Sequence, residues 1–231
     1  MLPLPDDEVH VWLIALPNDG RVPESLEVHL SPEESGRAAR FVFDRDRARY
    51  VVAHTALRDI LSAYTGDSPT AVALLAAEHG KPHLADHPDI RFNLSHSSSW
   101  AMAAVSLGRE VGVDIEWMRP ERPTVDIAQR FFAPGEVSEL MKIPEEGRAA
   151  AFFACWSRKE AYIKARGEGL RIGLDSFEVS LDEVAVLRKA PDLERWSLCA
   201  LAAPSGYAAA LMAEGSGWRV KQRQWSGLPK T

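Results

Sequence analysis

Gly112-Val113-Asp114-Ile115-Glu116 decides the interpretation of this chain, together with Trp156-Ser157-Arg158-Lys159-Glu160-Ala161-Tyr162-Ile163-Lys164 further along. In the first stretch, apolar residues alternate with Asp114 and Glu116, the period-two pattern of a half-buried strand. Both carboxylates therefore leave the same face of the strand, roughly 6.5–7 Å apart. A gap of this size suits one hard cation held between the two side chains.

The second stretch predicts a helix that carries a third carboxylate. Phe152, Phe153, Trp156 and Ile163 mark its buried stripe, and Glu160 lies four residues after Trp156, so it points along that stripe. A buried carboxylate without a partner is costly. Its partner is either a metal ion or a basic group.

Two simpler interpretations account for these acids separately. Lys164, one turn after Glu160, can form an ordinary helical ion pair with it. Asp114 and Glu116 can be two solvated residues at the exposed end of a strand. Three carboxylates from two elements, taken together, favour Mg²⁺, which prefers oxygen ligands. Zinc is disfavoured because no His or Cys accompanies them.

Length and composition limit the class of protein. The chain has 231 residues, 46% of them hydrophobic, which permits one large domain or two small ones. Its net charge of −6 argues against a general nucleic-acid binder. The start lacks a secretory signal pattern, and no apolar run approaches the ~20 residues of a membrane span. We expect a cytoplasmic protein that binds neither nucleic acid nor membrane.

A pass along the chain predicts helices and strands in two similar series. The first has a strand from His10, a short helix with Ser31 as N-cap, a long helix from about Asp46, and strands over 90–94 and 100–107, with a polar loop at 95–99 between them. The second has the Asp114 strand, a helix over 148–166, and strands over 174–181, 196–203 and 207–212.

A weak internal repeat supports this division. Ser98-Ser-Trp-Ala-Met-Ala-Ala-Val and Ser205-Gly-Tyr-Ala-Ala-Ala-Leu-Met each stand late in a helix-then-strands series. We predict an α+β fold of two similar halves, each a long helix on a small, mostly antiparallel sheet, related by a pseudo-twofold with the site at their junction. The halves are placed at 1–110 and 111–231, with a linker over 117–145.

At this point the two stretches resemble the paired signature of the 4′-phosphopantetheinyl transferases, of the long Sfp-type class. The likeness extends to four further motifs in the family's order: Ser31-Pro-Glu, Gly80-Lys81-Pro82, Phe92-Asn-Leu-Ser95-His96-Ser97 and Arg130-Phe-Phe-Ala-Pro-Gly-Glu. It covers most of residues 30 to 180.

The resemblance implies a reaction: transfer of the 4′-phosphopantetheine arm of coenzyme A to a serine hydroxyl of an apo carrier protein, with release of adenosine 3′,5′-bisphosphate. By matched position, Asp114, Glu116 and Glu160 bind Mg²⁺, with Mn²⁺ as a substitute, and Glu160 is the general base, directly or through a water. Lys164 lies on the phosphates as a second catalytic group, and Lys159 is a further candidate there.

Five other residues match positions that bind coenzyme A in the family: Arg37, Arg49, Lys81, Ser95 and His96. The resemblance thereby assigns the nucleotide to the first half. Glu34 stands where some relatives carry a lysine. Arg37 or Arg49 is therefore expected to hold the 3′-phosphate alone.

For the carrier, the resemblance implies acyl, peptidyl or aryl carrier domains of peptide synthetases, polyketide synthases or fatty-acid synthase, modified by a monomeric enzyme. The apolar segment after the Asp114 strand is a candidate docking surface through Trp117, Met118, Phe131 and Phe132, although core packing explains the two phenylalanines equally well. Two other functions stay open: a Mg²⁺-dependent hydrolase of the coenzyme A pyrophosphate, which would use the same three carboxylates with water as nucleophile, and a non-catalytic coenzyme A-binding module, which would need Lys81, His96 and the arginines but has little use for three converging acids.

Overall fold

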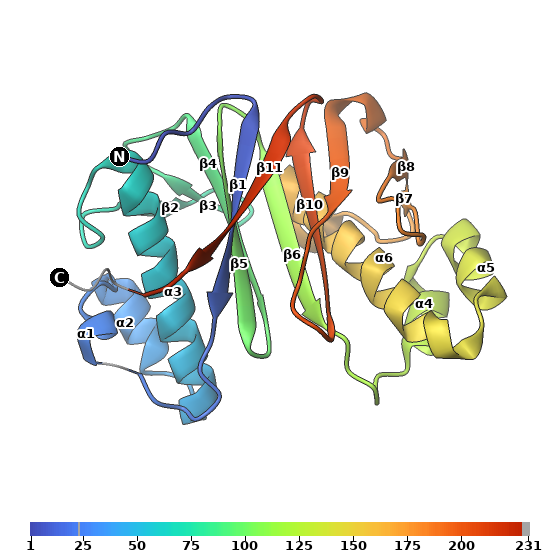
Figure 1. The fold of residues 1–231 in the computed structure, drawn as a ribbon, viewed down its shortest axis with the longest axis horizontal. Coiled ribbons are helices and arrows are strands. Elements are labelled where there is room, and N and C mark those ends of the chain that lie inside the picture. Colours follow the sequence, from blue (N-terminus) through green and yellow to red (C-terminus); the bar gives the residue numbers. More distant parts are fainter. Residues whose placement is uncertain (23, 228–231) are drawn as a thin grey trace.

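Two small sheets stand against each other in the middle of the molecule, and one long helix covers the outer face of each (Figure 1). The computed structural model describes residues 1–22 and 24–227. The apolar layer between the sheets draws on both of them, with Val11 and Met102 on one side and Val113 and Leu211 on the other. The predicted α+β architecture of two packed halves is confirmed.

The first half contains the elements up to Leu107. They are β1 (Glu8–Ala15), α1 (Glu24–Glu27), α2 (Pro32–Ala38), α3 (Asp44–Thr65), β2 (Leu74–Ala76), β3 (Pro82–Leu84), β4 (Ile90–Ser97) and β5 (Trp100–Leu107). Ser31 caps α2 in the predicted capping box with Glu34. Gly66 ends α3 in the left-handed conformation, which glycine adopts at low cost.

The second half follows the same plan. It contains β6 (Val111–Trp117), α4 (Thr124–Phe131), α5 (Pro134–Lys142), α6 (Glu145–Arg166), two 3₁₀ turns, β7 (Glu178–Val179), β8 (Leu187–Lys189), β9 (Trp196–Ala200) and β10 (Tyr207–Glu214). Helices α4 and α5 occupy the expected linker. The final strand, β11 (Arg219–Trp225), comes after β10.

The two halves repeat one topology. In the first, a strand, a long helix and two strands give the order β1-β5-β4; in the second, the same series gives β6-β10-β9. All of these strand pairs are antiparallel. The stretches that suggested a repeat become β5 and β10, the central strand of each set.

The structure differs from the expected division in two places. Strand β11 pairs with β1 in parallel, so residues 219–225 belong to the sheet of the first half although they were assigned to the second. The last four residues of the range 111–231 lie outside the described part. Ser95 and His96, expected in a loop, lie on β4, because its pairing with β5 continues to Ser97 and Trp100.

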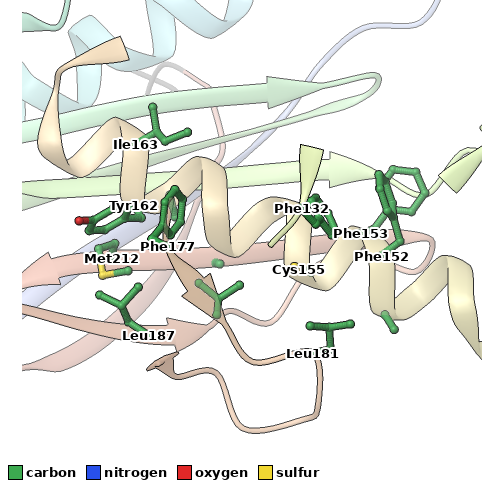
Figure 2. Close-up of a cluster of buried hydrophobic side chains, with 14 of the residues drawn as sticks. Phe132, Phe152, Phe153, Cys155, Tyr162, Ile163, Phe177, Leu181, Leu187 and Met212 are labelled. Atoms are coloured by element: carbon green, nitrogen blue, oxygen red, sulfur yellow. The ribbon is translucent and has the colours of Figure 1, made fainter. Parts of the chain in front are cut away.

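Helix α6 packs on its sheet through the predicted stripe. Figure 2 shows the cluster, in which Phe152 stacks on Phe132 at 5.2 Å between ring centroids and meets Phe153 edge to face at the same distance. Phe132 is 4% exposed, so it belongs to this core and is unavailable for docking. Within the described residues, we find no helix both long and apolar enough to span a membrane.

Gly112 allows the helix to approach the metal-site strand. A methyl group at this position would overlap the carbonyl oxygen of Ala161 and the amide nitrogen of Ala165, both in the backbone of α6. The absence of a side chain at Gly112 therefore sets the distance between Asp114 on β6 and Glu160 and Lys164 on α6.

We predict that Gly112→Ala lowers the free energy of unfolding by about 3 kcal/mol, the upper end of the usual cost of overpacking, since rigid helix backbone must move. Urea denaturation followed by circular dichroism measures the loss. Gly36→Ala is the matched control, because nothing lies within 4 Å of the added methyl on helix α2. Its stability should rise by up to about 1 kcal/mol. Equal effects of the two changes would contradict this account.

Candidate functional site

A row of polar side chains joins the two halves where β4 runs beside β6. Three side chains of β4 accept hydrogen bonds from alternate backbone amides of β6. The pairs are Asn93 with Val113 at 2.9 Å, Ser95 with Ile115 at 3.5 Å and Ser97 with Trp117 at 3.1 Å. The unpaired edge of β6 is thus satisfied by side chains instead of by another strand.

The same serines orient the two carboxylates of β6. The hydroxyl of Ser95 donates to Asp114 at 2.8 Å, and that of Ser97 donates to Glu116 at 2.9 Å. Each serine thus uses both its donor and its acceptor capacity. Sequence reasoning proposed Ser95 as a ligand group and missed Asn93 and Ser97, because it ended the strand at residue 94, whereas all three stand at alternate positions of β4.

Helix α6 brings a lysine and the third carboxylate to this point. The Lys164 ammonium lies 2.6 Å from Oδ1 of Asp114 and 2.7 Å from the Ser95 hydroxyl. Asp114 is 2% exposed, and its Oδ2 has no hydrogen-bond partner among the described residues. Glu160 likewise has no hydrogen bond or ion pair within the described part of the chain.

Burial and mutual repulsion make these acids costly to ionise together. Burial raises the pKa of Glu160, and the charge of Asp114 raises it further, while Lys164 acts in the opposite direction. The pKa of Glu116 is raised by the same two causes and lowered in part by Ser97 and Arg122. One lysine therefore faces three acids, an excess of negative charge that a divalent cation would neutralise.

The carboxylates are oxygen donors of the kind that a hard cation prefers, but their positions do not form a complete set of ligands. Within residues 1–22 and 24–227, no group of three or more His, Cys, Asp or Glu side chains converges closely enough to hold an ion as it stands. Lys164 engages one oxygen of Asp114, and the other oxygen is buried and unpartnered. That unpartnered oxygen is the feature that a metal ligand would satisfy.

A cavity of about 400 Å³ opens beside the carboxylates, between the halves. Its lining residues come from α3 and the chain before it, from the β4–β5 hairpin and from the end of β6 onward. They are Phe41, Asp46, Arg49, Tyr50, His96, Ser97, Ser98, Glu116, Arg119 and Arg122. Arg49, His96 and Glu116 were predicted site residues. Arg119 and Arg122 were missed, although they follow the carboxylate strand directly.

The predicted basic residues of the first half have different surroundings. Arg49 donates to the Asn18 side chain at 2.7 Å and to the Pro17 carbonyl at 3.3 Å. Arg37 lies over the Tyr50 ring, 5.5 Å from its centroid, next to the cavity lining. Partial burial, then the charge of Lys164 and other nearby cations, lowers the pKa of His96 and so favours a neutral imidazole.

Lys81 stands apart from this cavity, at the other end of β6. Its ammonium donates to Glu110 at 2.8 Å and to the carbonyl oxygens of Val111 at 3.1 Å and Ala165 at 2.9 Å. The bond to Ala165 satisfies a carbonyl in the last turn of α6. Lys81 thus connects the halves, and its binding of coenzyme A stays a prediction.

The assignment of Lys159 to the phosphates is wrong. Its side chain is fully buried in the second half and pairs with Glu136 at 2.7 Å. The ammonium also donates to the carbonyl oxygens of Leu174 at 2.7 Å and Phe177 at 2.8 Å. With every donor used inside the core, Lys159 fastens the loop after α6 and cannot reach a ligand.

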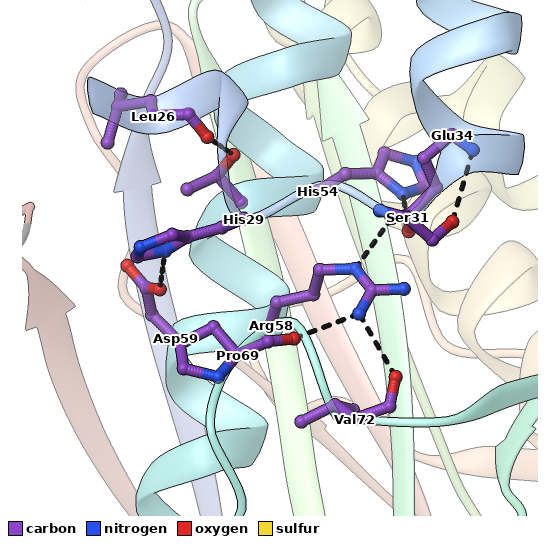
Figure 3. Close-up of polar contacts among 10 residues, drawn as sticks. Leu26, His29, Ser31, Glu34, His54, Arg58, Asp59, Pro69 and Val72 are labelled. Carbon is purple, nitrogen blue, oxygen red and sulfur yellow. Dashed lines mark hydrogen bonds and ion pairs between the residues drawn. The ribbon is translucent and has the colours of Figure 1, made fainter. Parts of the chain in front are cut away.

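Glu34, the departure from the family pattern, is also committed to the fold. One oxygen accepts from Arg58 at 2.6 Å and from the Ser31 amide at 2.8 Å, and the other lies 3.1 Å from His54 (Figure 3). Burial opposes ionisation, but these hydrogen bonds outweigh it and lower the pKa of Glu34 to about 2. The carboxylate is therefore neutralised by Arg58 and leaves Arg37 and Arg49 free of it.

Comparisons with known proteins agree with this geometry. Residues 110–212 match the sequence profile of the 4′-phosphopantetheinyl transferase superfamily, and residues 24–107 match the profile described as 4′-phosphopantetheinyl transferase, N-terminal. The two matches meet where β5 ends and β6 begins.

Curated relatives extend over most of the chain. The chain is 38% identical over 225 residues to the 4′-phosphopantetheinyl transferase HetI of Nostoc sp., an alignment that covers 95% of this chain and 93% of HetI. It is 37% identical over 164 residues to a 4′-phosphopantetheinyl transferase of Bacillus subtilis, with 71% and 72% covered. It is 34% identical over 154 residues to Sfp of Bacillus subtilis, with 67% of each chain covered.

Replacing Lys159 should destabilise the protein without a selective effect on ligand binding. Lys159→Met leaves Glu136 buried and unpaired, so we expect the free energy of unfolding to fall by about 3–5 kcal/mol. Adding Glu136→Gln should restore part of the loss. Exposed Lys142→Met is the control and should change stability by less than about 0.5 kcal/mol. A fully stable Lys159→Met variant with weakened coenzyme A binding would restore the original assignment.

Glu160→Gln should stabilise the metal-free protein at neutral pH by about 1 kcal/mol, the usual size for a favourable substitution. Because the folded pKa of Glu160 is raised, its ionised form costs stability. That cost is absent below the unfolded pKa of about 4.3 and complete above the folded pKa. The gain should therefore shrink as the pH falls towards 4. Urea denaturation in chelator at several pH values tests this, and a gain independent of pH would contradict it.

Proposed function

The chain belongs to the 4′-phosphopantetheinyl transferase superfamily, and we propose that the junction between its halves is the transferase site, with Mg²⁺ held by Asp114, Glu116 and Glu160. Enzymes of this family transfer the phosphopantetheine arm of coenzyme A to carrier proteins and generally use a divalent metal. We assign the metal to this place because a buried oxygen of Asp114 has no partner among the described residues and two further acids lie beside it.

The proposed step is a single displacement at phosphorus. The serine oxygen of the carrier forms a bond to the phosphorus on the pantetheine side of the pyrophosphate. The bond from that phosphorus to the bridging oxygen breaks, and its electron pair leaves with adenosine 3′,5′-bisphosphate. The hydroxyl proton passes to Glu160, directly or through one water. A divalent ion held by Asp114, Glu116 and Glu160 would neutralise the charge that develops on the phosphates.

Lys164 and the cavity supply the remaining positive charge. The Lys164 ammonium lies 2.6 Å from Oδ1 of Asp114, beside the proposed metal ligands, and is assigned to a phosphate oxygen of coenzyme A. Arg49 and His96 line the same cavity from the first half and are assigned to the nucleotide phosphates. Arg37, beside them over Tyr50, is the third candidate for that end.

We assign the physiological partners to carrier domains of peptide synthetases, polyketide synthases or fatty-acid synthase, modified by a cytoplasmic monomer. Of the expected docking residues, Phe132 is core and Met118 packs against the same core. Trp117 is half-buried, and Phe131 is 41% exposed. These two remain the proposed apolar contact.

The decisive experiment incubates the protein with coenzyme A, Mg²⁺ and an apo carrier protein, and weighs the carrier by intact-mass spectrometry. We expect the mass to rise by one phosphopantetheine, and chelator to abolish the reaction. Asp114→Asn and Glu160→Gln should each lower the rate at least a hundredfold, the scale of a lost general base or charge stabiliser. Both variants should keep their circular dichroism.

Glu121→Gln is the matched control, because Glu121 is an exposed acid close after β6, and its rate should stay within twofold of the wild type. Consumption of coenzyme A without a carrier would identify a hydrolase instead. Binding of coenzyme A with no turnover on any carrier would identify a binding module. Either result would overturn the proposed function.

A further inference from the structure

Arg122 is a cation at the cavity that the fold does not use. It stands in the turn after β6, where its carbonyl accepts from Thr124 at 2.8 Å and its amide donates to Arg119 at 3.3 Å. Its guanidinium lines the cavity and makes no side-chain hydrogen bond or ion pair with any residue of the described ranges. The backbone is thus fixed while all five guanidinium donors stay free of protein acceptors.

Two aromatic rings of α6 hold this side chain in place. The guanidinium carbon lies 5.1 Å from the centroid of Trp156 and 5.9 Å from that of Phe153. A cation over an aromatic face is attracted by the ring quadrupole, and its planar group keeps the donors at its edge available. Arg122 is therefore positioned without spending its hydrogen-bonding capacity.

The position of Trp156 places Arg122 beside the reacting groups. Trp156 lies four residues before Glu160, so both side chains leave the same face of α6 about one turn apart. On the strand side, Arg122 and Glu116 line the same cavity. A guanidinium over Trp156 thus stands about one helical turn from the proposed base, and it lines the cavity together with one proposed metal ligand, Glu116.

The other cations around this space have different commitments. Arg49 is anchored to Asn18 and Pro17 on the opposite wall, which belongs to the first half. Lys164 is bound to Asp114. Arg119 lies over Trp117, 5.8 Å from the ring centroid, and is not braced by the catalytic helix.

We propose that Arg122 is a substrate-binding residue that donates to the non-bridging oxygens of the phosphoryl group being transferred, the one on the pantetheine side. This inference rests on the proposed function. The serine proton goes to Glu160, so the attacked phosphorus must lie close to Glu160, and Arg122 lines the adjoining cavity from a position over Trp156, one helical turn away. Arg122 forms and breaks no covalent bond in the step. It offers a planar pair of donors, which match two phosphoryl oxygens.

The test compares two ligands that differ in this phosphoryl group. Isothermal titration calorimetry of Arg122→Gln with coenzyme A, in Mg²⁺ and without carrier, should show affinity weakened about tenfold to a hundredfold, the effect of losing a charge-assisted hydrogen bond. Adenosine 3′,5′-bisphosphate lacks the transferred phosphoryl, so its affinity should stay within twofold. Arg122→Lys should recover only part of the coenzyme A affinity, because an ammonium lacks the planar fork.

Arg130→Gln is the matched control. Arg130 also lies over an aromatic ring, 5.2 Å from the centroid of Phe131, but does not line the cavity. Its affinities for both ligands should equal those of the wild type. Equal weakening of both ligands by Arg122→Gln would show an effect through the nucleotide end or the fold. Unchanged coenzyme A binding with a raised KM for the carrier would assign Arg122 to carrier docking. Each of these results overturns the inference.

The wild-type transfer assay separates the two levels of the proposal. Transfer by the wild type, with coenzyme A affinity and rate unchanged in Arg122→Gln, would overturn the role of Arg122 and leave the proposed function standing. Absence of transfer by the wild type on every carrier would overturn the proposed function itself.

Discussion

The row of side-chain hydrogen bonds between β4 and β6 is the constraint on which the site depends. Within the described residues, no backbone ladder pairs these two strands. Asn93, Ser95 and Ser97 instead satisfy alternate amides of β6, and the two serines keep a hydroxyl proton for Asp114 and Glu116. The contact that holds the halves together therefore also aims the carboxylates.

This arrangement gathers like charges at the cost of stability. Desolvation and repulsion raise the pKa values of Glu116 and Glu160, and Lys164, helped at Glu116 by Ser97 and Arg122, compensates only in part. An assembly of apolar residues at the same place would be more stable. Buried charge that is poorly compensated within the protein indicates a site whose missing partner comes from solution, which is the usual compromise between stability and function.

The sequence allowed the acids to be located because each lies on a simple period. Alternation placed Asp114 and Glu116 on one strand face, and the four-residue spacing from Trp156 placed Glu160 on the helix. The same arithmetic also predicts the burial of Lys159, which lies four residues after Cys155 and seven after Phe152, but resemblance to a motif was given more weight. Helix spacing alone could not supply Glu136 as its partner, because that ion pair depends on how α5 packs against α6.

Periodicity could not predict the side-chain hydrogen bonds between β4 and β6 or the role of the arginines at the cavity. Polar residues on a strand indicate a solvent-facing surface unless the element packed against them is known. Here that element is β6, which belongs to the second half of the chain. Arg122 has no periodic signal, since it stands in a turn. Its significance depends on the aromatic rings of α6 below it, which are distant in sequence.

The duplicated topology explains why the two junctions between the halves differ. In the duplicated plan, β6 corresponds to β1 and β9 corresponds to β4. Full symmetry would therefore place β9 beside β1, in the way that β4 lies beside β6. Strand β11 fills that place instead: it pairs with β1, and the Gln222 side chain bonds both to the amide and to the carbonyl of Ala202, just after β9. On β1, the face towards α3 carries His10 and Trp12; Tyr64 bonds to both rings, and Glu8 bonds to the second ring nitrogen of His10. One junction is thus closed by a strand and apolar packing, and the other keeps serines, carboxylates and a cavity. Because the two similar halves have diverged, the proposed site lies at one junction, that between β4 and β6.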